Sequence, residues 1–494
     1  MRLAALVVLE RVLDHGSFRS WSVPGLPPDP DPAYADELAA ARERAGTDEA
    51  VVVGEGLLAG RRVAVVAGEF GFLGGSIGLA TAALLTATVA RATAERLPLL
   101  ASPVSGGTRM QEGTPAFVQM ATITAALAGH RRAGLPYLVW LRSPTFGGVF
   151  ASWGSLGHIT YAEPGAAIGF LGPRVYEALH AEAFPPDVQT AENLVACGLL
   201  DGVLPLEQLR GATVAALEVL CAPTTGLLPL LAADLEADAV PADPAWDDVL
   251  ASRRPDRPGV RDILHLGQVH LLELRGTGEG HVGAGTLLGL ARIGGVPCVL
   301  VGQDRTAGPV GPDDLRVARR GMALAEELRL PLVTVVDTSG GALSREAEEG
   351  GLAGQIAANL YDLAGTTVPT LCVLLGQGTG GVALALMSTD RVVAARHAWL
   401  SPLPPEGASV IVHRTVEHAA RMAVQQRIGC ADLLRDGVVD RVVDERDDAA
   451  AEPAAFARRL LAVVEDELLM LLAAPQQARL AARSRVRGLG AAAT

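Results

Sequence analysis

The sequence predicts an α/β protein that contains two tandem copies of one fold. Apolar runs that resemble buried strands alternate with glycine-rich loops and helical patterns, as in a layered α/β domain. A Gly-Gly loop follows such a run in each half of the chain, at Gly147-Gly148 and again at Gly380-Gly381. At 494 residues the chain is also too long for one ordinary core, so two or three domains are expected.

The elements of the first half follow one another in a regular order. An N-terminal helix and a Pro-rich segment precede a second helix, and a hairpin around Gly60 then opens the alternation of strand, loop and helix. The predicted ranges are helix 34–44, hairpin 51–69, helix 76–96, strand 97–102, loop and helix 105–130, strand 135–141, Gly-Gly loop 144–152 and strand 166–169.

Three segments of the first half recur in the second half in the same order. The glycines that mark them give offsets of 294 − 60 = 234, 340 − 106 = 234 and 380 − 147 = 233. Three collinear echoes at nearly one offset predict a duplicated fold. We therefore expect an N-terminal domain over residues 1–220, a linker rich in Pro, Asp and Ala over 221–257, and a C-terminal domain with a helical tail over 258–494.

The charged residues exclude several functions. The net charge of −14 makes a nucleic-acid partner unexpected. The sequence contains no lysine, so neither an internal Schiff base to pyridoxal phosphate nor a Walker lysine can exist. Any phosphate must therefore be bound by Arg side chains, backbone N–H groups or helix ends.

The apolar and sulfur-containing residues indicate a cytoplasmic protein without a metal. The two long uncharged stretches, 70–90 and 364–389, are interrupted by glycines, so they predict buried elements and not membrane spans. The apolar run at the N-terminus is too short for a secretory signal. The five cysteines are scattered without a C-x-x-C pair, which supports neither a disulfide framework nor a zinc site.

The two Gly-Gly loops are the strongest indication of chemistry. A glycine pair between a strand and a helix lets a ligand approach the backbone and directs N–H groups at it, as in an oxyanion hole. Such donors suit a reaction that passes through enolates, because the negative charge then forms on a carbonyl oxygen. A tight strand-to-helix turn is the alternative explanation for either loop alone. The internal repeat favours two oxyanion holes, one in each half.

The same segments carry a resemblance to a known family. Segments 69–76, 105–112, 144–152, 162–164 and 169–175 resemble the β-type carboxyltransferase subunit of bacterial acetyl-CoA carboxylase. Segments 257–258, 337–341, 376–385 and 405–409 resemble the α-type subunit of the same enzyme. The resemblance covers residues 50–220 and 250–445 in the order of the family. It implies a fused carboxyltransferase with two tandem crotonase-like (ClpP/crotonase) domains made of ββα units.

The resemblance also implies a reaction. In this family carboxylate passes from carboxybiotin, carried by a separate protein, to the α-carbon of an acyl-CoA. Acetyl-CoA or propionyl-CoA would give malonyl-CoA or methylmalonyl-CoA, as in fatty acid biosynthesis. Carboxybiotin supplies both CO₂ and the base, so no side-chain base is required. The expected partners are a biotin carboxylase and biotin carboxyl carrier subunit and other copies of this chain, as a dimer or a higher oligomer such as a hexamer.

Site residues are carried over from the family motifs position by position. The resemblance implies that the N–H groups of Gly147 and Gly148 hold the thioester oxygen and that those of Val382 and Ala383 hold the ureido oxygen of biotin. The expected substrate-binding residues are Gly106, Gly107, Arg109, Gly172, Arg174, Gly340, Gly341, Gly380 and Gly381. Arg109 and Arg174 lie beside glycine-rich loops, where they could bind CoA phosphates or pair with a carboxylate.

The sequence departs from the family in three places. The four-cysteine zinc ribbon that begins many β-type subunits is missing, so no zinc is expected. Val382 stands where the family usually has glycine, which could narrow access to biotin. The family's Asp-Thr-Pro-Gly-Ala-Tyr is changed at residues 337–342, beside the same pocket. Two alternatives therefore remain open, a malonyl-thioester decarboxylase of the same fold and a catalytically inactive carboxylase subunit.

Overall fold

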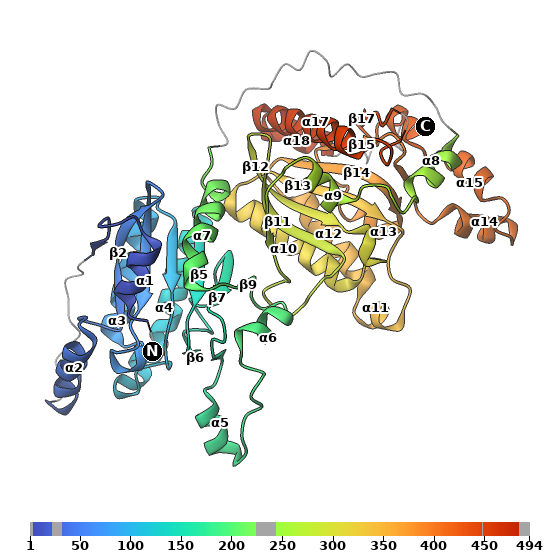
Figure 1. The fold of residues 1–494 in the computed structure, drawn as a ribbon. Helices are drawn as coiled ribbons and strands as arrows, with labels where there is room; N and C mark the ends of the chain where they lie inside the picture. Colours follow the sequence, from blue (N-terminus) through green and yellow to red (C-terminus); the bar gives the residue numbers. More distant parts are fainter. Residues whose placement is uncertain (1–2, 22–31, 224–243, 447, 484–494) are drawn as a thin grey trace. The chain divides into compact units, whose positions relative to one another are not determined.

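The computed structural model describes residues 3–21, 32–223, 244–446 and 448–483 (Figure 1). The chain forms two compact units: residues 1–221 with 275–280 make unit 1, and residues 222–274 with 281–494 make unit 2. Most of the predicted Pro-rich segment 24–32 and of the predicted linker lies outside the described residues.

Unit 1 is built on one seven-stranded sheet. A short antiparallel part at one edge, β1 to β3, continues into parallel strands that are connected by helices. The strands in spatial order are β1 (Arg19–Ser20), β2 (Val51–Leu58), β3 (Arg61–Gly68), β4 (Leu99–Ser102), β5 (Tyr137–Leu141), β7 (Ile159–Ala162) and β9 (Gly202–Val203). The β2–β3 hairpin that the sequence predicts is confirmed.

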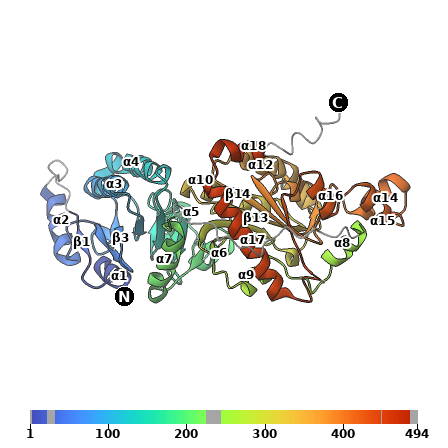
Figure 2. The same ribbon diagram turned by 90° about the horizontal axis from the view of Figure 1, so that it is seen from above.

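Helices cover both faces of this sheet. Figure 2 shows α3 (Leu79–Ala94) and α4 (Gly113–Arg132) on one face, with α1 (Ala5–Val12) and α7 (Leu206–Leu220) on the other. The apolar faces of α3 and α4 join the strands in one core cluster. The remaining helices of the unit are α2 (Pro32–Ala45), α5 (Pro173–His180) and α6 (Ala191–Ala196).

Unit 2 repeats this plan. Its sheet has the strand order β10 (Leu271–Leu274), β11 (Thr286–Ile293), β12 (Val296–Gln303), β13 (Leu332–Thr338), β14 (Thr370–Thr379), β15 (Arg391–Ala395) and β17 (Arg441–Val443), with β16 (Trp399–Ser401) paired to the end of β14. The first pairs are again antiparallel and the rest parallel. The duplicated α/β fold predicted from the sequence is therefore present.

The helices of unit 2 occupy corresponding places and add an extension. Helix α9 packs against α17 as α1 packs against α7. The helices are α8 (Ala245–Ser252), α9 (Val260–Leu266), α10 (Pro312–Leu328), α11 (Arg345–Glu349), α12 (Leu352–Gly365), α13 (Gly380–Leu384), α14 (Pro405–His413), α15 (Ala419–Gln425), α16 (Cys430–Arg435), α17 (Pro453–Ala473) and α18 (Gln476–Arg483). Helix α8 lies within the stretch that the sequence assigned to a linker; it packs on α15 and β16 around the buried Trp399.

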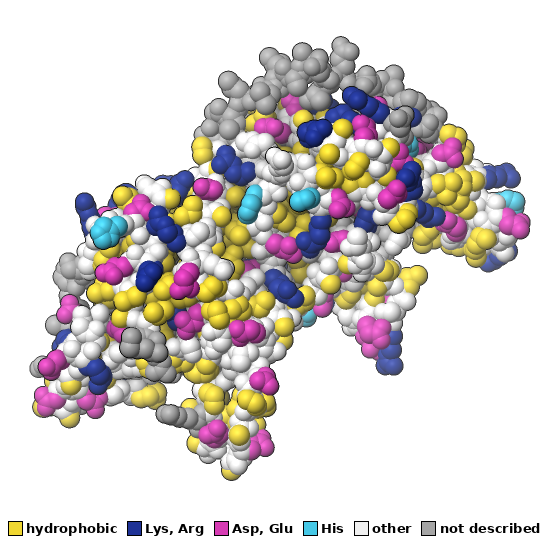
Figure 3. Space-filling model, viewed as in Figure 1, with side chains coloured by type: hydrophobic (Ala, Val, Ile, Leu, Met, Phe, Trp, Pro, Cys, Tyr) yellow, Lys and Arg dark blue, Asp and Glu magenta, His cyan; other side chains and the backbone are white. Residues whose placement is uncertain are grey.

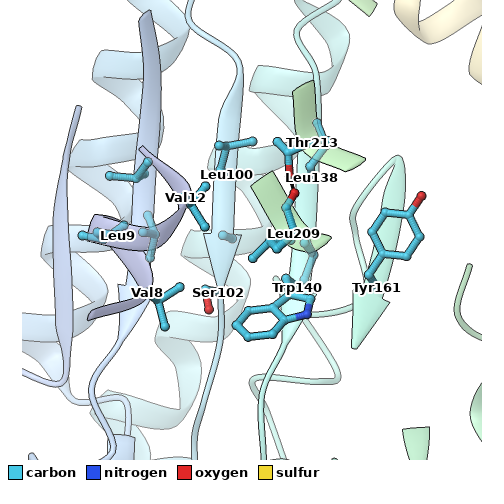
Figure 4. A pocket seen from close by; sticks show the side chains of 14 residues that line it. Val8, Leu9, Val12, Leu100, Ser102, Leu138, Trp140, Tyr161, Leu209 and Thr213 are labelled. Carbon is cyan, nitrogen blue, oxygen red and sulfur yellow. Dashed lines mark hydrogen bonds between the residues drawn. The ribbon is translucent and has the colours of Figure 1, made fainter. Parts of the chain in front are cut away.

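Each unit has a small apolar cavity between its sheet and this pair of helices. In unit 1 the cavity has a volume of about 40 Å³ and lies beneath α1 and α7, with Ser102 and Trp140 among the side chains that line it (Figure 4). The corresponding cavity in unit 2, about 20 Å³, is lined by aliphatic side chains alone, Val335 among them. The duplication thus extends to the packing defects of the two cores.

The structure bears on three features discussed from the sequence: membrane-spanning helices, metal or disulfide sites, and the distribution of surface charge. Within the described ranges no helix combines the length and the apolar character that a membrane span requires. The same part of the chain contains no cluster of three or more metal-ligating side chains, and all five cysteines are free thiols. On the face drawn in Figure 3, basic and acidic side chains are interspersed.

Candidate active site

The first glycine turn begins where two short strands end. Strand β6 (Thr145–Phe146) pairs in parallel with β8 (Ile168–Gly169). Gly147 follows with φ = 64°, a backbone conformation that favours glycine. Its N–H donates to the carbonyl oxygen of Phe170 at 2.9 Å and so extends the pairing by one residue. This donor is therefore already in use in this structure, and the expected role of the Gly147 N–H towards a substrate oxygen stays a prediction.

Gly148, the second glycine of this turn, has an unused N–H donor. Among the described residues no group accepts a hydrogen bond from the N–H of Gly148 or of Val149. Gly148 is half-buried, whereas Val149 is fully buried. Within the described part of the chain, Gly148 and Phe150 are thus the half-buried residues of this turn whose N–H groups have no acceptor.

The loop after β4 lies against this turn. Ser105 and Thr145 form a bridge between the two segments, and a side chain on Gly147 would lie 3.4 Å from the Cα of Gly107. The N–H groups of Gly106 and Gly107 donate to the carbonyl of Gly74 at 2.9 Å and to the Ser105 hydroxyl at 3.0 Å. These glycines thus lie next to the first turn with their N–H groups occupied, and their role in substrate binding stays a prediction.

Arg109 is a structural residue of this loop. It is 1% exposed and forms an ion pair of 2.8 Å with Glu49 and one of 3.4 Å with Glu112. It also donates to the carbonyl of Ser76 at 2.8 Å. Burial alone would lower the pKa of Arg109, but the hydrogen bond and charge of Glu49 outweigh it and raise the pKa above its usual value. Of the two roles that the sequence left open, pairing with carboxylates is the one observed.

The second glycine turn repeats the geometry of the first. The end of β14 pairs with β16, and Gly380 follows with φ = 73°. Gly340 has φ = 128° and donates its N–H to the Thr338 hydroxyl at 3.1 Å, as Gly107 with φ = 122° does to Ser105. These bonds match Gly107 with Gly340, so the structural offset of both loops is 233 and not the 234 that pairs Gly106 with Gly340.

The accessible backbone of the second turn is at Gly380 and Gly381. Gly380 is half-buried and Gly381 exposed, whereas Val382 and Ala383 are 1% and 0% exposed. The Val382 side chain belongs to a small core cluster with Leu352. The two residues that the resemblance assigned to biotin therefore have no surface for a ligand in this structure. By its position in the repeat, Gly381 corresponds to Gly148.

Two polar side chains near the second turn have unused capacity for hydrogen bonds. The hydroxyl of Thr379 and Oε1 of Gln303 are buried and have no partner among the described residues. Nε2 of Gln303 donates to the carbonyl of Val382 at 3.0 Å, which holds the turn against β12. A Cβ added to Gly341 would lie 3.3 Å from Cγ1 of Val382, so the loop after β13 is also in contact with the turn.

Two ion pairs lie next to the second turn. Asp337 is buried, accepts a hydrogen bond from the N–H of Gln377 at 3.0 Å and lies 3.4 Å from Arg305. Burial raises the pKa of Asp337. Arg253, from the stretch predicted as a linker, pairs with Glu406 at 2.5 Å and donates to Oε1 of Gln377 at 3.3 Å. Sequence reasoning missed Arg253 because its partners are more than 120 residues away.

The two remaining candidates lie around α5. Gly172 is the N-cap residue of α5, and a side chain on it would approach Cδ2 of Phe146 to 3.8 Å, so it lies close to the first turn. Arg174 is in the first turn of the same helix, and its side chain lies outside the described residues.

Comparison with known proteins relates the chain to one family. The model of the carboxyl transferase domain matches residues 3–469. A probable biotin-dependent acyl-coenzyme A carboxylase beta3 subunit of Mycobacterium tuberculosis (strain ATCC 25618 / H37Rv) is 60% identical over 451 residues, which are 90% of each chain. The acetyl-coenzyme A carboxylase carboxyl transferase subunits beta/alpha of Salinispora arenicola are 37% identical over 478 residues, covering 91% of this chain and 83% of that one.

The fold has a match among solved structures. A crystal structure of transcarboxylase 12S, with methylmalonyl-coenzyme A and methylmalonic acid bound, aligns with a TM-score of 0.74 over 92% of this chain and 88% of that chain at 21% identity. This likeness confirms the predicted crotonase-like architecture. With the family model matched over nearly the whole chain, and with relatives of 37% and 60% identity, the chain belongs to the carboxyl transferase domain family.

Proposed function

We propose that this protein is the carboxyltransferase component of a biotin-dependent acyl-CoA carboxylase. It would transfer carboxylate from carboxybiotin, on a separate carrier protein, to the α-carbon of an acyl-CoA, with acetyl-CoA and propionyl-CoA as the first substrates to test. The observation that supports this proposal is the pair of equivalent glycine turns, each with an accessible backbone at its second glycine.

The first turn suits a thioester oxygen. Loss of the α-proton puts negative charge on that oxygen, and an N–H fixed in place stabilises the charge without reorganisation. We assign this role to Gly148, a half-buried residue whose N–H is unpaired, in place of Gly147. Gly147 instead holds the turn in position through its bond to Phe170.

The second turn suits the ureido oxygen of biotin. Gly381 offers exposed backbone there, and the unused hydroxyl of Thr379 makes the surroundings polar. Carboxybiotin bound here would supply the carboxyl group and the base for the α-proton. The chain itself would bind and orient both carbonyl groups. It would not have to supply a side-chain base, because carboxybiotin brings the base.

Exposed apolar side chains support an assembly with further copies of the chain. Val410, Ile411 and Val412 on α14 are exposed, as are Val175 and Leu179 on α5. Such patches mark interaction surfaces. The transcarboxylase 12S of the structural comparison is described as a hexamer. We propose that this protein also forms a homo-oligomer and works with a biotin carboxylase and carrier subunit.

The reverse reaction tests the proposal. Purified protein is incubated with malonyl-CoA or methylmalonyl-CoA and free biotin or biocytin, and the formation of acetyl-CoA or propionyl-CoA is followed. We expect decarboxylation that depends on biotin. Turnover of equal rate without biotin would instead support a malonyl-thioester decarboxylase, and no turnover by the folded protein with either substrate would contradict an active carboxyltransferase.

A further inference from the structure

One side chain next to each turn differs between the two units. Met120 on α4 lies against Gly148: its Cγ and Sδ are both 3.2 Å from the place where a Cβ on that glycine would stand. Ile356 on α12 lies against Gly381 in the same way, with Cδ1 at 3.2 Å and Cγ2 at 3.3 Å. Both side chains are half-buried, so each also has surface next to an accessible backbone.

The two side chains have different mechanical properties. Methionine is unbranched and polarizable and adapts to irregular apolar shapes. Isoleucine is branched at Cβ and stiff at χ1, so it offers a fixed surface. Met120 is also held from one side, because the Ser152 hydroxyl lies 3.6 Å from its Sδ.

The neighbourhood of Met120 contains aromatic side chains, whereas Ile356 packs against a cluster of aliphatic side chains. Phe117, one helical turn before Met120, is 61% exposed, and Phe146 and Phe150 beside the glycines are half-buried. Four of the nine phenylalanines of the chain, 117, 146, 150 and 170, therefore lie on or beside the first turn and α4. Three residues before Ile356 the second unit has Ala353, and in place of Phe146 it has Thr379.

We propose that Met120 is a specificity-determining residue of the acyl site, and that its side chain limits the length of the acyl group bound at Gly148. This inference rests on the proposed function and names the residue that selects among acyl-CoA substrates. Shortening the side chain opens apolar space beside Gly148, and a bulky ring closes it. In an apolar pocket each methylene of a substrate changes discrimination by about tenfold or more.

The test compares substrates within one variant. The ratio of kcat/KM for butyryl-CoA to that for acetyl-CoA is measured in biotin-dependent carboxylation with the complete carboxylase, with biotin carboxylase and carrier present. Met120→Ala is expected to raise this ratio about tenfold, and Met120→Phe is expected to lower it by a similar factor. Met120→Leu nearly keeps the side-chain volume, so its ratio is expected to equal that of the unmodified protein.

Ile356→Ala is the matched control on the second unit. It is expected to change KM for biocytin in the reverse reaction and to leave the acyl-CoA ratio unchanged. A constant ratio in both Met120→Ala and Met120→Phe, in proteins that retain biotin-dependent turnover, would overturn the inference. Absence of biotin-dependent turnover in the unmodified protein would overturn the proposed function itself, so the two failures are distinguishable.

Discussion

The two glycine turns have the same backbone and different surroundings. Gly147 and Gly380 have φ values of 64° and 73°, and each follows a pair of parallel strand ends. The residue before the glycine is Phe146 in unit 1 and Thr379 in unit 2. The comparison teaches that both units share the backbone geometry, whereas the side chains around it differ: aromatic residues lie beside the first turn, and aliphatic residues with Thr379 lie beside the second.

The ion pairs that hold the two turns in place also differ between the units. Arg109 and its partners, the buried Glu49 and the half-buried Glu112, brace the loop of unit 1. At the offset of 233, the corresponding residue of unit 2 is Ala342. Unit 2 is braced instead from outside the loop by Arg253, which pairs with Glu406 and reaches Gln377 next to the turn. Equivalent turns are thus held by unrelated ion pairs.

Removal of Arg109 should give the largest effect on stability. In Arg109→Met the buried carboxylate of Glu49 loses its partner, which costs about 3 to 5 kcal/mol of folding free energy. Hydrogen exchange should show this loss in unit 1 and not in unit 2, which serves as the internal reference. If Arg109 bound CoA instead, the substitution would raise KM for acyl-CoA and leave the exchange of unit 1 unchanged.

Removal of the N–H donors should give the largest effect on catalysis. Gly148→Pro and Gly381→Pro each delete one donor, and loss of one oxyanion donor costs about 3 kcal/mol, or 10² to 10³ in kcat. Gly148→Ala is the matched control, because it keeps the N–H and places its Cβ against the flexible end of Met120. Equal losses in the Ala and Pro variants would show that shape, and not the donor, is what these glycines provide.

As the pH falls, the folding stability of unit 1 should decrease before that of unit 2. Burial lowers the pKa of His130 on α4 to about 4, whereas α12 of unit 2 has no histidine. An unfolded histidine takes up a proton near pH 6.5, so the stabilisation by neutral His130 is complete above that pH and is lost as the pH falls towards 4. The loss amounts to about 3 kcal/mol. Exchange in unit 1 between pH 7.5 and 4.5 should show it, and His130→Gln should remove that pH dependence.

The smallest change in folding stability is expected from substitutions in the two apolar cavities, beneath α1 and α7 in unit 1 and beneath α9 and α17 in unit 2. Ser102 has a buried hydroxyl without a partner among the described residues, and the residue at the corresponding place in unit 2 is Val335. Ser102→Val removes the unsatisfied group and fills space, so it should stabilise unit 1 by about 1 kcal/mol. The reverse change, Val335→Ser, should destabilise unit 2 by a comparable or larger amount. A destabilising Ser102→Val would mean that the cavity is too narrow for the added methyl groups.

The sequence predicted the parts of the site that depend on local pattern. Apolar runs identified the strands, and the glycines with positive φ were recognised because few other residues adopt that conformation. The constant offset then gave the duplication. The crotonase-like architecture itself came from the family resemblance, because strand order is not encoded in local periodicity.

The sequence did not predict which N–H groups are available. The bond from Gly147 to Phe170 depends on the pairing of β6 with β8, and although a strand over 166–169 was predicted, its partner was not. The pairing of Arg109 with Glu49 joins residues 60 positions apart. Helix α8 was assigned to a linker because its eight residues lie beside a long stretch rich in Pro and Asp. In each case tertiary contacts decide the outcome.

Each turn belongs to a separate compact unit, yet both units are encoded in one chain. For gene expression this means that every translated molecule carries one turn of each kind. The stoichiometry of the two kinds is fixed at one to one, whatever the rate of synthesis. An assembly that needs both turns therefore never accumulates an excess of one half.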